Sequence, residues 1–103
     1  MEQRQYKTSP RFRGYLFERE VRKKLEEMGF FVFRSTGSFK VDLIAFSPKG
    51  NVYWIECKLH RDLSQKEKQR WEEIAKTYHA HFVVVNRFNL KQFLFLLKSN
   101  EGI

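Results

Sequence analysis

The sequence has little of what secreted and membrane proteins carry. It contains one cysteine, Cys57, which excludes an internal disulfide; because this residue lies in an apolar segment, we expect a buried, reduced thiol in a cytoplasmic protein. The longest purely apolar run, FLFLL at residues 93–97, is far too short to span a bilayer. The first ten residues, MEQRQYKTSP, include no apolar segment, so we expect no signal peptide. No internal repeat or low-complexity stretch is visible.

Negative charge is also scarce. The 103 residues hold 12 Asp and Glu against 20 Lys and Arg, which gives a net charge of +8. Such a balance favours a polyanionic partner, most often nucleic acid, over a basic surface kept only for solubility. An anionic membrane surface is a weaker alternative because no basic amphipathic helix stands out. Hydrophobic residues, at 42% of the chain, are sufficient for the core of one domain.

Turn residues and periodicity divide the chain into a short arm and one domain. We expect residues 1–10 to form a flexible basic arm and residues 11–103 a single domain. Two helices are expected, at 12–28 and after a capping box of Ser64 and Glu67, with strands at 30–34, 41–46, 52–59 and 81–85. The strands 41–46 and 52–59 should form an antiparallel hairpin around the turn SPKGN. The segment LKQFLFLL, residues 90–97, contains a continuous apolar run too short for periodicity to decide between strand and helix. The order predicts a mixed α/β fold, a central mixed β-sheet flanked by α-helices.

Each expected helix carries an apolar stripe that should face the sheet. The stripe of the first helix comprises Phe17, Val21, Leu25 and Met28. The stripe of the second comprises Trp71, Ile74, Ala75 and Tyr78.

Three charges interrupt the expected hairpin strands. Asp42 lies in KVDLIAF, and Glu56 and Lys58 lie in VYWIECKL. Side chains alternate across a strand, so Glu56 and Lys58 share a face, and the hairpin can place Asp42 beside them. A structural ion pair at a sheet edge is the simpler explanation. However, two converging carboxylates repel each other, and a divalent cation such as Mg²⁺ or Mn²⁺ resolves that repulsion. The pattern therefore favours a functional site.

Glu18 is a possible fourth member of this cluster. It lies at the edge of the apolar stripe of the first helix. Periodicity alone favours an ordinary ion pair with Arg22, four residues further on.

These residues resemble the PD-(D/E)xK nuclease signature, in which an Asp is followed after a hairpin by Glu-x-Lys. The wider sequence resembles the archaeal-type Holliday junction resolvases over residues 11–86, most clearly in GYLFEREVRKKLEEMGFFVFRSTGSFKVDLIAF and VYWIECKLHRDLS. A glutamate in the first helix, an arginine after the next strand and a Ser/Gly loop recur in that family, and they match Glu18, Arg34 and residues 35–38. The proline usual before the aspartate is Val41 here. The resemblance implies a restriction-endonuclease-like core, so that residues 11–103 form one nuclease domain.

The resemblance also implies Mg²⁺-dependent hydrolysis of phosphodiester bonds, with Mn²⁺ as a substitute. Asp42, Glu56 and the main-chain carbonyl of Cys57 would hold the metal, with Glu18 completing the site directly or through water. Lys58 would orient or deprotonate the attacking water. Ser38, and Thr36 beside it in the loop, would donate a hydroxyl group to a phosphate oxygen, although both are equally consistent with an ordinary polar loop.

DNA binding is expected from basic residues near this site, because the Arg fork makes two hydrogen bonds to a phosphate. The candidates are Arg11, Arg13, Arg34, Lys40, His60 and Arg61. Resolvases of this kind act as homodimers on four-way junctions, and the aromatic-rich strands could leave apolar surface for such a contact. The alternatives are a related nuclease acting on flaps, duplex or foreign DNA, and a non-catalytic DNA-binding module on the same fold. An RNA-processing nuclease with metal-free chemistry fits the motif less well.

Overall fold

The computed structural model describes residues 9–35 and 41–103 of the chain. In these residues three helices and four strands follow one another in the order α1 (Pro10–Glu27), β1 (Phe31–Arg34), β2 (Leu43–Phe46), β3 (Val52–Cys57), α2 (Gln65–Thr77), β4 (Ala80–Val85) and α3 (Leu90–Glu101). Residues 1–8, most of the predicted arm, lie outside the described part. The adjoining Ser9 and Pro10 begin α1: the Ser9 side chain accepts a hydrogen bond from the Phe12 amide at 3.1 Å.

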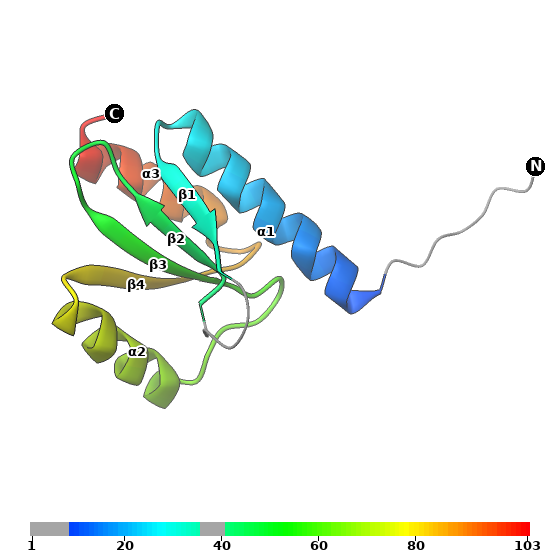
Figure 1. Cartoon of the computed structure of the whole chain (residues 1–103). Helices are drawn as coiled ribbons and strands as arrows, with labels where there is room; N and C mark the ends of the chain where they lie inside the picture. Colours follow the sequence, from blue (N-terminus) through cyan, green and yellow to red (C-terminus); the bar gives the residue numbers. More distant parts are fainter. Residues whose placement is uncertain (1–8, 36–40) are drawn as a thin grey trace, which may run out of the picture.

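The strands form one mixed sheet in the order β1-β2-β3-β4 (Figure 1). β2 pairs antiparallel with both β1 and β3, which confirms the predicted hairpin, and β4 lies parallel to β3. With helices on both faces, this is the predicted fold class. Because β3 and β4 are parallel, their C-terminal ends meet at one edge of the sheet, and the segments that follow them lie side by side.

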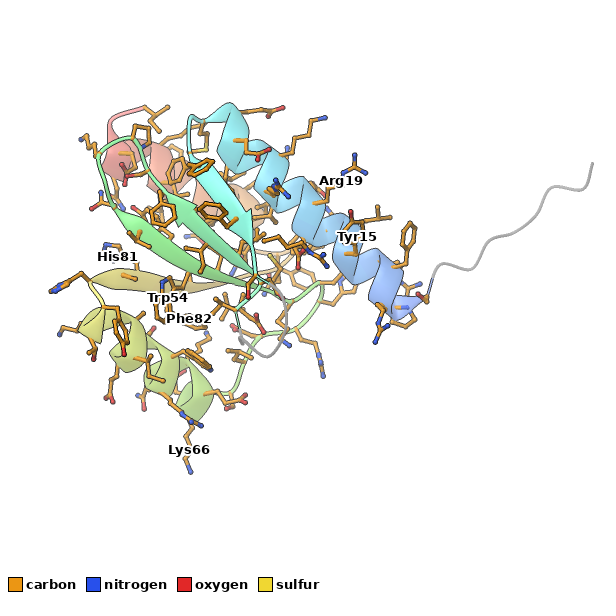
Figure 2. The ribbon with its side chains drawn as sticks, in the orientation of Figure 1. Tyr15, Arg19, Trp54, Lys66, His81 and Phe82 are labelled. Atoms are coloured by element: carbon orange, nitrogen blue, oxygen red, sulfur yellow. The ribbon has the colours of Figure 1, made fainter. Side chains whose placement is uncertain are left out.

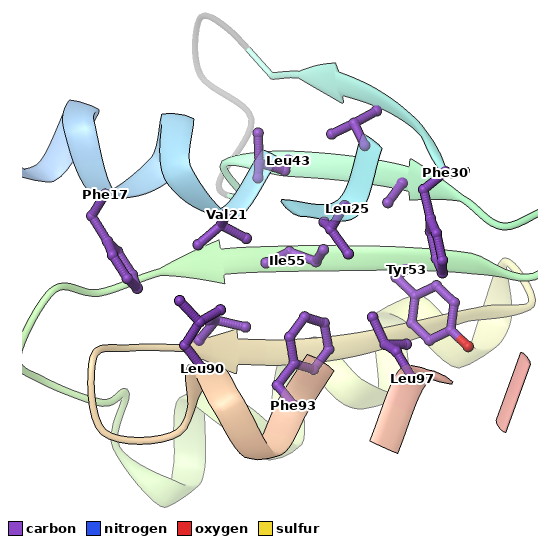
Figure 3. Close-up of a cluster of buried hydrophobic side chains, with 13 residues drawn as sticks. Phe17, Val21, Leu25, Phe30, Leu43, Tyr53, Ile55, Leu90, Phe93 and Leu97 are labelled. Carbon is purple, nitrogen blue, oxygen red and sulfur yellow. The ribbon is translucent and has the colours of Figure 1, made fainter. Parts of the chain in front are cut away.

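One face of the sheet carries the hydrophobic core beneath α1 and α3 (Figure 3). Phe17, Val21 and Leu25 of α1 are fully buried, as their spacing predicts. Residues 90–97, for which the sequence did not decide between strand and helix, are helical. In α3 Leu90, Phe93 and Leu97 lie at helical spacing and are buried against the same face.

The opposite face is covered only in part, by α2. The Trp71 ring stacks on Phe82 of β4 at 6.2 Å, and Ala75 is buried. The prediction that Tyr78 belongs to the buried stripe is wrong, because this side chain is 68% exposed. The helix ends at Thr77, so Tyr78 is its C-cap, and its ring stacks against Trp54 of β3.

Part of this face is apolar and exposed. We call it the aromatic face and define it as Phe31, Phe33, Phe46, Trp54 and Tyr78. The strand register places the first four on one side of the sheet, and the ring centroids of Phe31 and Phe33 are 4.7 Å apart. Phe31 is 63% exposed and packs against its neighbour Phe33, so much of this aromatic surface faces water.

The predicted start of the second helix is confirmed. Ser64 is the N-cap of α2, and its hydroxyl oxygen accepts the Glu67 amide at 3.2 Å. The same hydroxyl donates to the Glu67 carboxylate at 3.4 Å, so the side-chain contact differs from that of a full capping box. None of α1, α2 and α3 has the length and apolarity needed to cross a bilayer.

Candidate active site

Asp42, Glu56 and Lys58 come together at one edge of the sheet. β2 begins at Leu43 and β3 ends at Cys57, so Asp42 and Lys58 flank the strands that were predicted to contain them. Leu43 pairs with Ile55, and the Asp42 amide continues the ladder by donating to the Ile55 carbonyl at 3.0 Å. Asp42 therefore lies opposite Glu56, and the Lys58 Nζ lies 3.5 Å from Glu56 Oε2. The convergence expected from strand alternation is present.

The two carboxylates are held differently. Asp42 Oδ2 accepts the main-chain N–H of Cys57 at 2.7 Å, a bond that fixes this carboxylate against the end of β3. Glu56 Oε1 is buried and has no hydrogen-bond partner within residues 9–35 and 41–103. A buried acceptor without a partner costs roughly 1–3 kcal/mol. The site thus contains an oxygen for which the surrounding protein provides no donor.

Burial and, after it, the nearby Asp42 carboxyl group raise the pKa of Glu56 to about 7. Lys58 acts in the opposite direction without cancelling it. The lysine alone therefore does not neutralise the pair, and the pair is short of positive charge when both carboxylates are ionised.

A divalent cation fits this donor set. Two carboxylates that converge on one point, one of them with a buried free oxygen, are the hard ligands that Mg²⁺ and Mn²⁺ prefer. In the part of the chain that the structure describes, no group of three or more His, Cys, Asp and Glu side chains has the geometry of a metal site. A metal at Asp42 and Glu56 would therefore take further ligands from main-chain oxygen, water or substrate.

Cys57 contributes its main chain to this site, and its side chain belongs to the core. The thiol packs against the core cluster, and burial strongly raises its pKa, with the nearby Asp42 charge acting in the same direction. It is therefore a protonated thiol and no thiolate ligand. The predicted role of its carbonyl oxygen as a metal ligand stays a prediction.

Glu18 borders the site without joining the pair. Its carboxylate accepts a hydrogen bond from Arg34 Nε, whereas Arg22 pairs with Glu26 at 3.2 Å. The expected Glu18–Arg22 pair is thus wrong, because the β1 strand brings Arg34 within reach of α1. Burial raises the pKa of Glu18 and the Asp42 charge raises it further, against the effect of Arg34, so the two carboxylates lie close enough to interact. A metal-binding role for Glu18 stays a prediction.

The predicted DNA contacts fall into three groups. Arg11 and Arg13 lie exposed in the first turns of α1. Arg34 ends β1, with its guanidinium 5.1 Å from the centre of the Tyr15 ring. His60 and Arg61 are exposed in the segment that follows Lys58. Ser38 and Lys40, together with Thr36, lie outside the described residues.

The structure adds residues that the sequence did not indicate. A groove of about 360 Å³ along α1 is lined by Arg19, Arg22 and Lys23 as well as Glu18 and Arg34, and Figure 2 shows Tyr15 and Arg19 on this helix. A cavity of about 170 Å³ beside Glu56 and Lys58 reaches Glu67 and Trp71 of α2. The only sequence signal that could have indicated the basic side of α1 is the helical spacing of Arg19, Arg22 and Lys23.

Arg87 is a second unpredicted neighbour. Its amide donates to the Leu59 carbonyl at 3.0 Å, and its side chain bonds Glu20 of α1 at 2.7 Å. Arg87 lies beside the segment that follows Lys58 because β4 runs parallel to β3, so that both strands end on the same side of the sheet. No local sequence signal predicts that pairing.

The mixed sheet with its flanking helices has a restriction-endonuclease-like fold, and comparisons with known proteins identify the family. Residues 9–97 match the family described as archaeal Holliday junction resolvase (Hjc). The crossover junction endodeoxyribonuclease Hjc of Methanocaldococcus jannaschii is 54% identical over 46 residues, 45% of this chain and 34% of that protein. The matched segment thus spans about a third of the length of this curated relative.

Solved structures agree with this result. The Hjc of Archaeoglobus fulgidus, a Holliday junction resolvase from a hyperthermophile, superposes with a TM-score of 0.60 at 25% identity, over 73% of this chain and 64% of that one. A VRR_NUC domain at 18% identity has the same fold, with a TM-score of 0.59 over 80% of this chain and 94% of that domain. The chain belongs to the archaeal Holliday junction resolvase family.

Proposed function

We propose that this protein is a structure-selective DNA endonuclease that cuts four-way junctions by hydrolysing phosphodiester bonds with the help of Mg²⁺ or Mn²⁺. The observation that carries the proposal is the Asp42–Glu56 pair beside Lys58, with the buried Glu56 Oε1 left without a donor. In a chain of this family, that arrangement is better explained by a hydrolytic metal site than by a structural ion pair.

Asp42 and Glu56 would hold the metal, together with the Cys57 carbonyl and, directly or through water, Glu18. When bound, the ion would polarise the scissile phosphate and lower the pKa of a water molecule. The Cys57 N–H keeps the Asp42 carboxylate oriented through its bond to Oδ2. Lys58, 3.5 Å from Glu56, would orient the attacking water, help to remove its proton and offset negative charge that develops on the phosphate.

The net charge of +8 and the exposed arginines around the site support a DNA substrate. Arg11, Arg13, Arg34 and Arg61 would contact phosphates, together with Lys40 and His60. None of these positions predicts base recognition, so the protein would recognise backbone and shape. Binding should weaken steeply as salt rises, and a flat salt response would contradict the role of charge.

We also propose that the protein acts as a homodimer through the aromatic face. Exposed rings at Phe31, Phe33 and Tyr78 form an apolar surface that a monomer in water would not favour. Light scattering should give the mass of a dimer for the wild type and of a monomer for Tyr78→Glu. A monomeric wild type would remove this part of the proposal. A cytoplasmic location stays a prediction, supported by the unpaired Cys57.

The test compares cleavage of a four-way junction with cleavage of a linear duplex of matched sequence, with and without Mg²⁺. Wild type and Asp42→Asn are assayed in parallel. Metal-dependent paired cuts in the junction alone, lost in the variant, are expected. Equal cutting of both DNAs would leave a nuclease of this fold with another preferred substrate, such as flaps or foreign DNA. Binding without any cutting would favour the non-catalytic DNA-binding module.

A further inference from the structure

The turn between β4 and α3 is unusually well fixed for an exposed loop. Asn86, 7% exposed, accepts the amides of Phe88 and Asn89 on its Oδ1 at 2.8 and 2.9 Å. Its own amide donates to Asn89 Oδ1 at 2.8 Å. Asn89 in turn donates to the Val84 carbonyl at 2.9 Å. The two asparagines therefore hold the main chain of Phe88 in one conformation.

This turn is also bonded to the segment that follows the Glu56/Lys58 motif. The Lys58 amide donates to the Val85 carbonyl at 2.9 Å, and the Arg87 amide donates to the Leu59 carbonyl at 3.0 Å. The Asn86 side chain adds a third bond, to the Arg61 carbonyl at 3.2 Å. The position of the turn is therefore fixed relative to the candidate active site.

The side chain at the tip of this fixed turn is a phenylalanine directed into water. Phe88 is 78% exposed, the highest value among the large hydrophobic side chains in residues 9–35 and 41–103. Its ring centre lies 6.2 Å from that of His60. Arg87 precedes it, and the main chain of Arg61 is bonded to the same turn. An exposed aromatic ring on a fixed main chain thus lies beside the basic segment of His60 and Arg61, where a phosphate backbone would pass, while the Arg87 guanidinium is paired with Glu20.

Basic residues and a free aromatic ring together are the elements that bind unstacked nucleotides: the cations attract the phosphates and the ring stacks on a base. In a continuous duplex each base is already stacked on its neighbours, and exposing one has a free-energy cost. At a branch point the stacking is interrupted, so a base is available at lower cost. A protein ring beside the cutting site could therefore distinguish branched from linear DNA.

We propose that Phe88 stacks on a DNA base at the branch point and thereby strengthens binding of branched over duplex DNA. This inference rests on the proposed function and assigns a specificity-determining contact to it. Phe88 takes no part in the hydrolysis itself, so its effect belongs to binding and to the choice of substrate.

The experiment measures affinity for a four-way junction and for a matched duplex, in an Asp42→Asn background that prevents cutting. Phe88→Ala should weaken junction binding roughly 5- to 100-fold while duplex binding changes less than about twofold. Phe88→Trp should bind the junction like the parent, and Phe88→Leu, apolar but not aromatic, should behave like the alanine variant. Phe95→Ala is the matched control, since Phe95 is 71% exposed on α3 and should affect neither DNA.

A spectroscopic readout separates stacking from a general loss of structure. With 2-aminopurine at the branch point, complexes of the parent and of Phe88→Trp should be less fluorescent than that of Phe88→Ala, because stacking on the ring quenches the probe. Unchanged junction affinity in Phe88→Ala, an equal loss for junction and duplex, or parent-like binding by Phe88→Leu would overturn the inference. A Phe88 parent with no preference for the junction would overturn it as well. Absence of metal-dependent cutting by the wild type would contradict the proposed function instead.

Discussion

Two glutamates at opposite ends of β3, the buried Glu101 and the partly buried Glu56, show how this fold surrounds a carboxylate that stabilises the structure and one that is accessible to ligands. Glu101 of α3 is 4% exposed and lies against the turn of the β2–β3 hairpin and the beginning of β3. Its Oε2 accepts hydrogen bonds from the Tyr53 hydroxyl at 2.7 Å and the Asn51 side chain at 2.8 Å. Burial pushes the pKa of Glu101 upward, but these bonds and the nearby Lys49 charge hold it below its ordinary value.

Glu56 has the opposite surroundings. Its closest cation is Lys58 at 3.5 Å, a second carboxylate faces it, and its pKa is raised by burial to about 7. Both glutamates have a buried Oε1 without a partner in the described residues, but only Glu101 has neutral donors on its other oxygen. The difference indicates that Glu101 is arranged for stability, whereas Glu56 is arranged to receive a cation.

The comparison is tested most strongly by cleavage rates. Glu56→Gln should lower the single-turnover rate of junction cleavage by roughly 10³-fold or more, because the loss of one charged ligand weakens the metal site. Glu101→Gln should stay within a few-fold of the wild type. A similar loss in both variants would mean that the two sites do not differ in function.

For the free energy of unfolding we expect the larger loss at Glu101 and little or none at Glu56. Glu101→Ala removes the acceptor of one buried and one partly buried hydrogen bond and should lower the free energy of unfolding by roughly 2–4 kcal/mol. Glu56→Gln should leave the metal-free protein as stable as the wild type or more stable at pH 8, since it removes an unfavourable buried charge. Urea denaturation measures both; a strongly destabilised Glu56→Gln protein would indicate a structural role.

The free energy of unfolding should also depend on pH, with a smaller effect whose sign follows from the raised pKa of Glu56. Glu56 has a folded-state pKa raised from about 4.5 to about 7, so the folded state binds more protons than the unfolded state in that window. The free energy of unfolding of the metal-free protein should therefore fall as pH rises from about 4.5 to 7, by roughly 1–3 kcal/mol. Mg²⁺ should restore the loss at pH 8. Glu56→Gln should show neither effect, and an equal pH slope in that variant would assign it to another group.

The smallest effect concerns a peripheral member of the Glu101 network. Ser47, 7% exposed, accepts the Asn51 amide at 3.0 Å, and its side chain is among the groups that lower the pKa of Glu101. Ser47→Ala should cost about 1 kcal/mol of stability and leave junction cleavage unchanged. A change in the cleavage rate without a change in stability would show that the two ends of the hairpin are coupled.

The sequence predicts one of these two sites much better than the other. Asp42, Glu56 and Lys58 lie on neighbouring strands joined by a short hairpin, so strand alternation and a turn signal suffice to bring them together. Glu101 meets Asn51 and Tyr53 only through the packing of α3, which lies about fifty residues away in the chain. The segment 90–97 ends in the short continuous apolar run 93–97, whose periodicity does not reveal α3, so this contact had no local signal.

Two predictions are wrong for the same physical reason, because packing between distant elements decides the contact. The ion pair of Glu18 was assigned to Arg22 from helical spacing, but β1 supplies Arg34, and tertiary packing prevails over the local choice. Tyr78 fits the periodicity of α2 but lies beyond its last turn, where the sheet no longer covers it. Helix and strand periodicities predict the elements and their inner faces; they do not predict which distant elements meet at their ends.

The most direct test of the account is a titration with Mn²⁺, followed by electron paramagnetic resonance, of the wild type, Glu56→Gln and Glu101→Gln. We expect the wild type and Glu101→Gln to bind the ion with the same affinity and Glu56→Gln to lose binding by at least about tenfold. A wild type that binds no ion, or a Glu56→Gln protein that binds it as well as the wild type, would contradict the claim that the Asp42–Glu56 pair is a metal site.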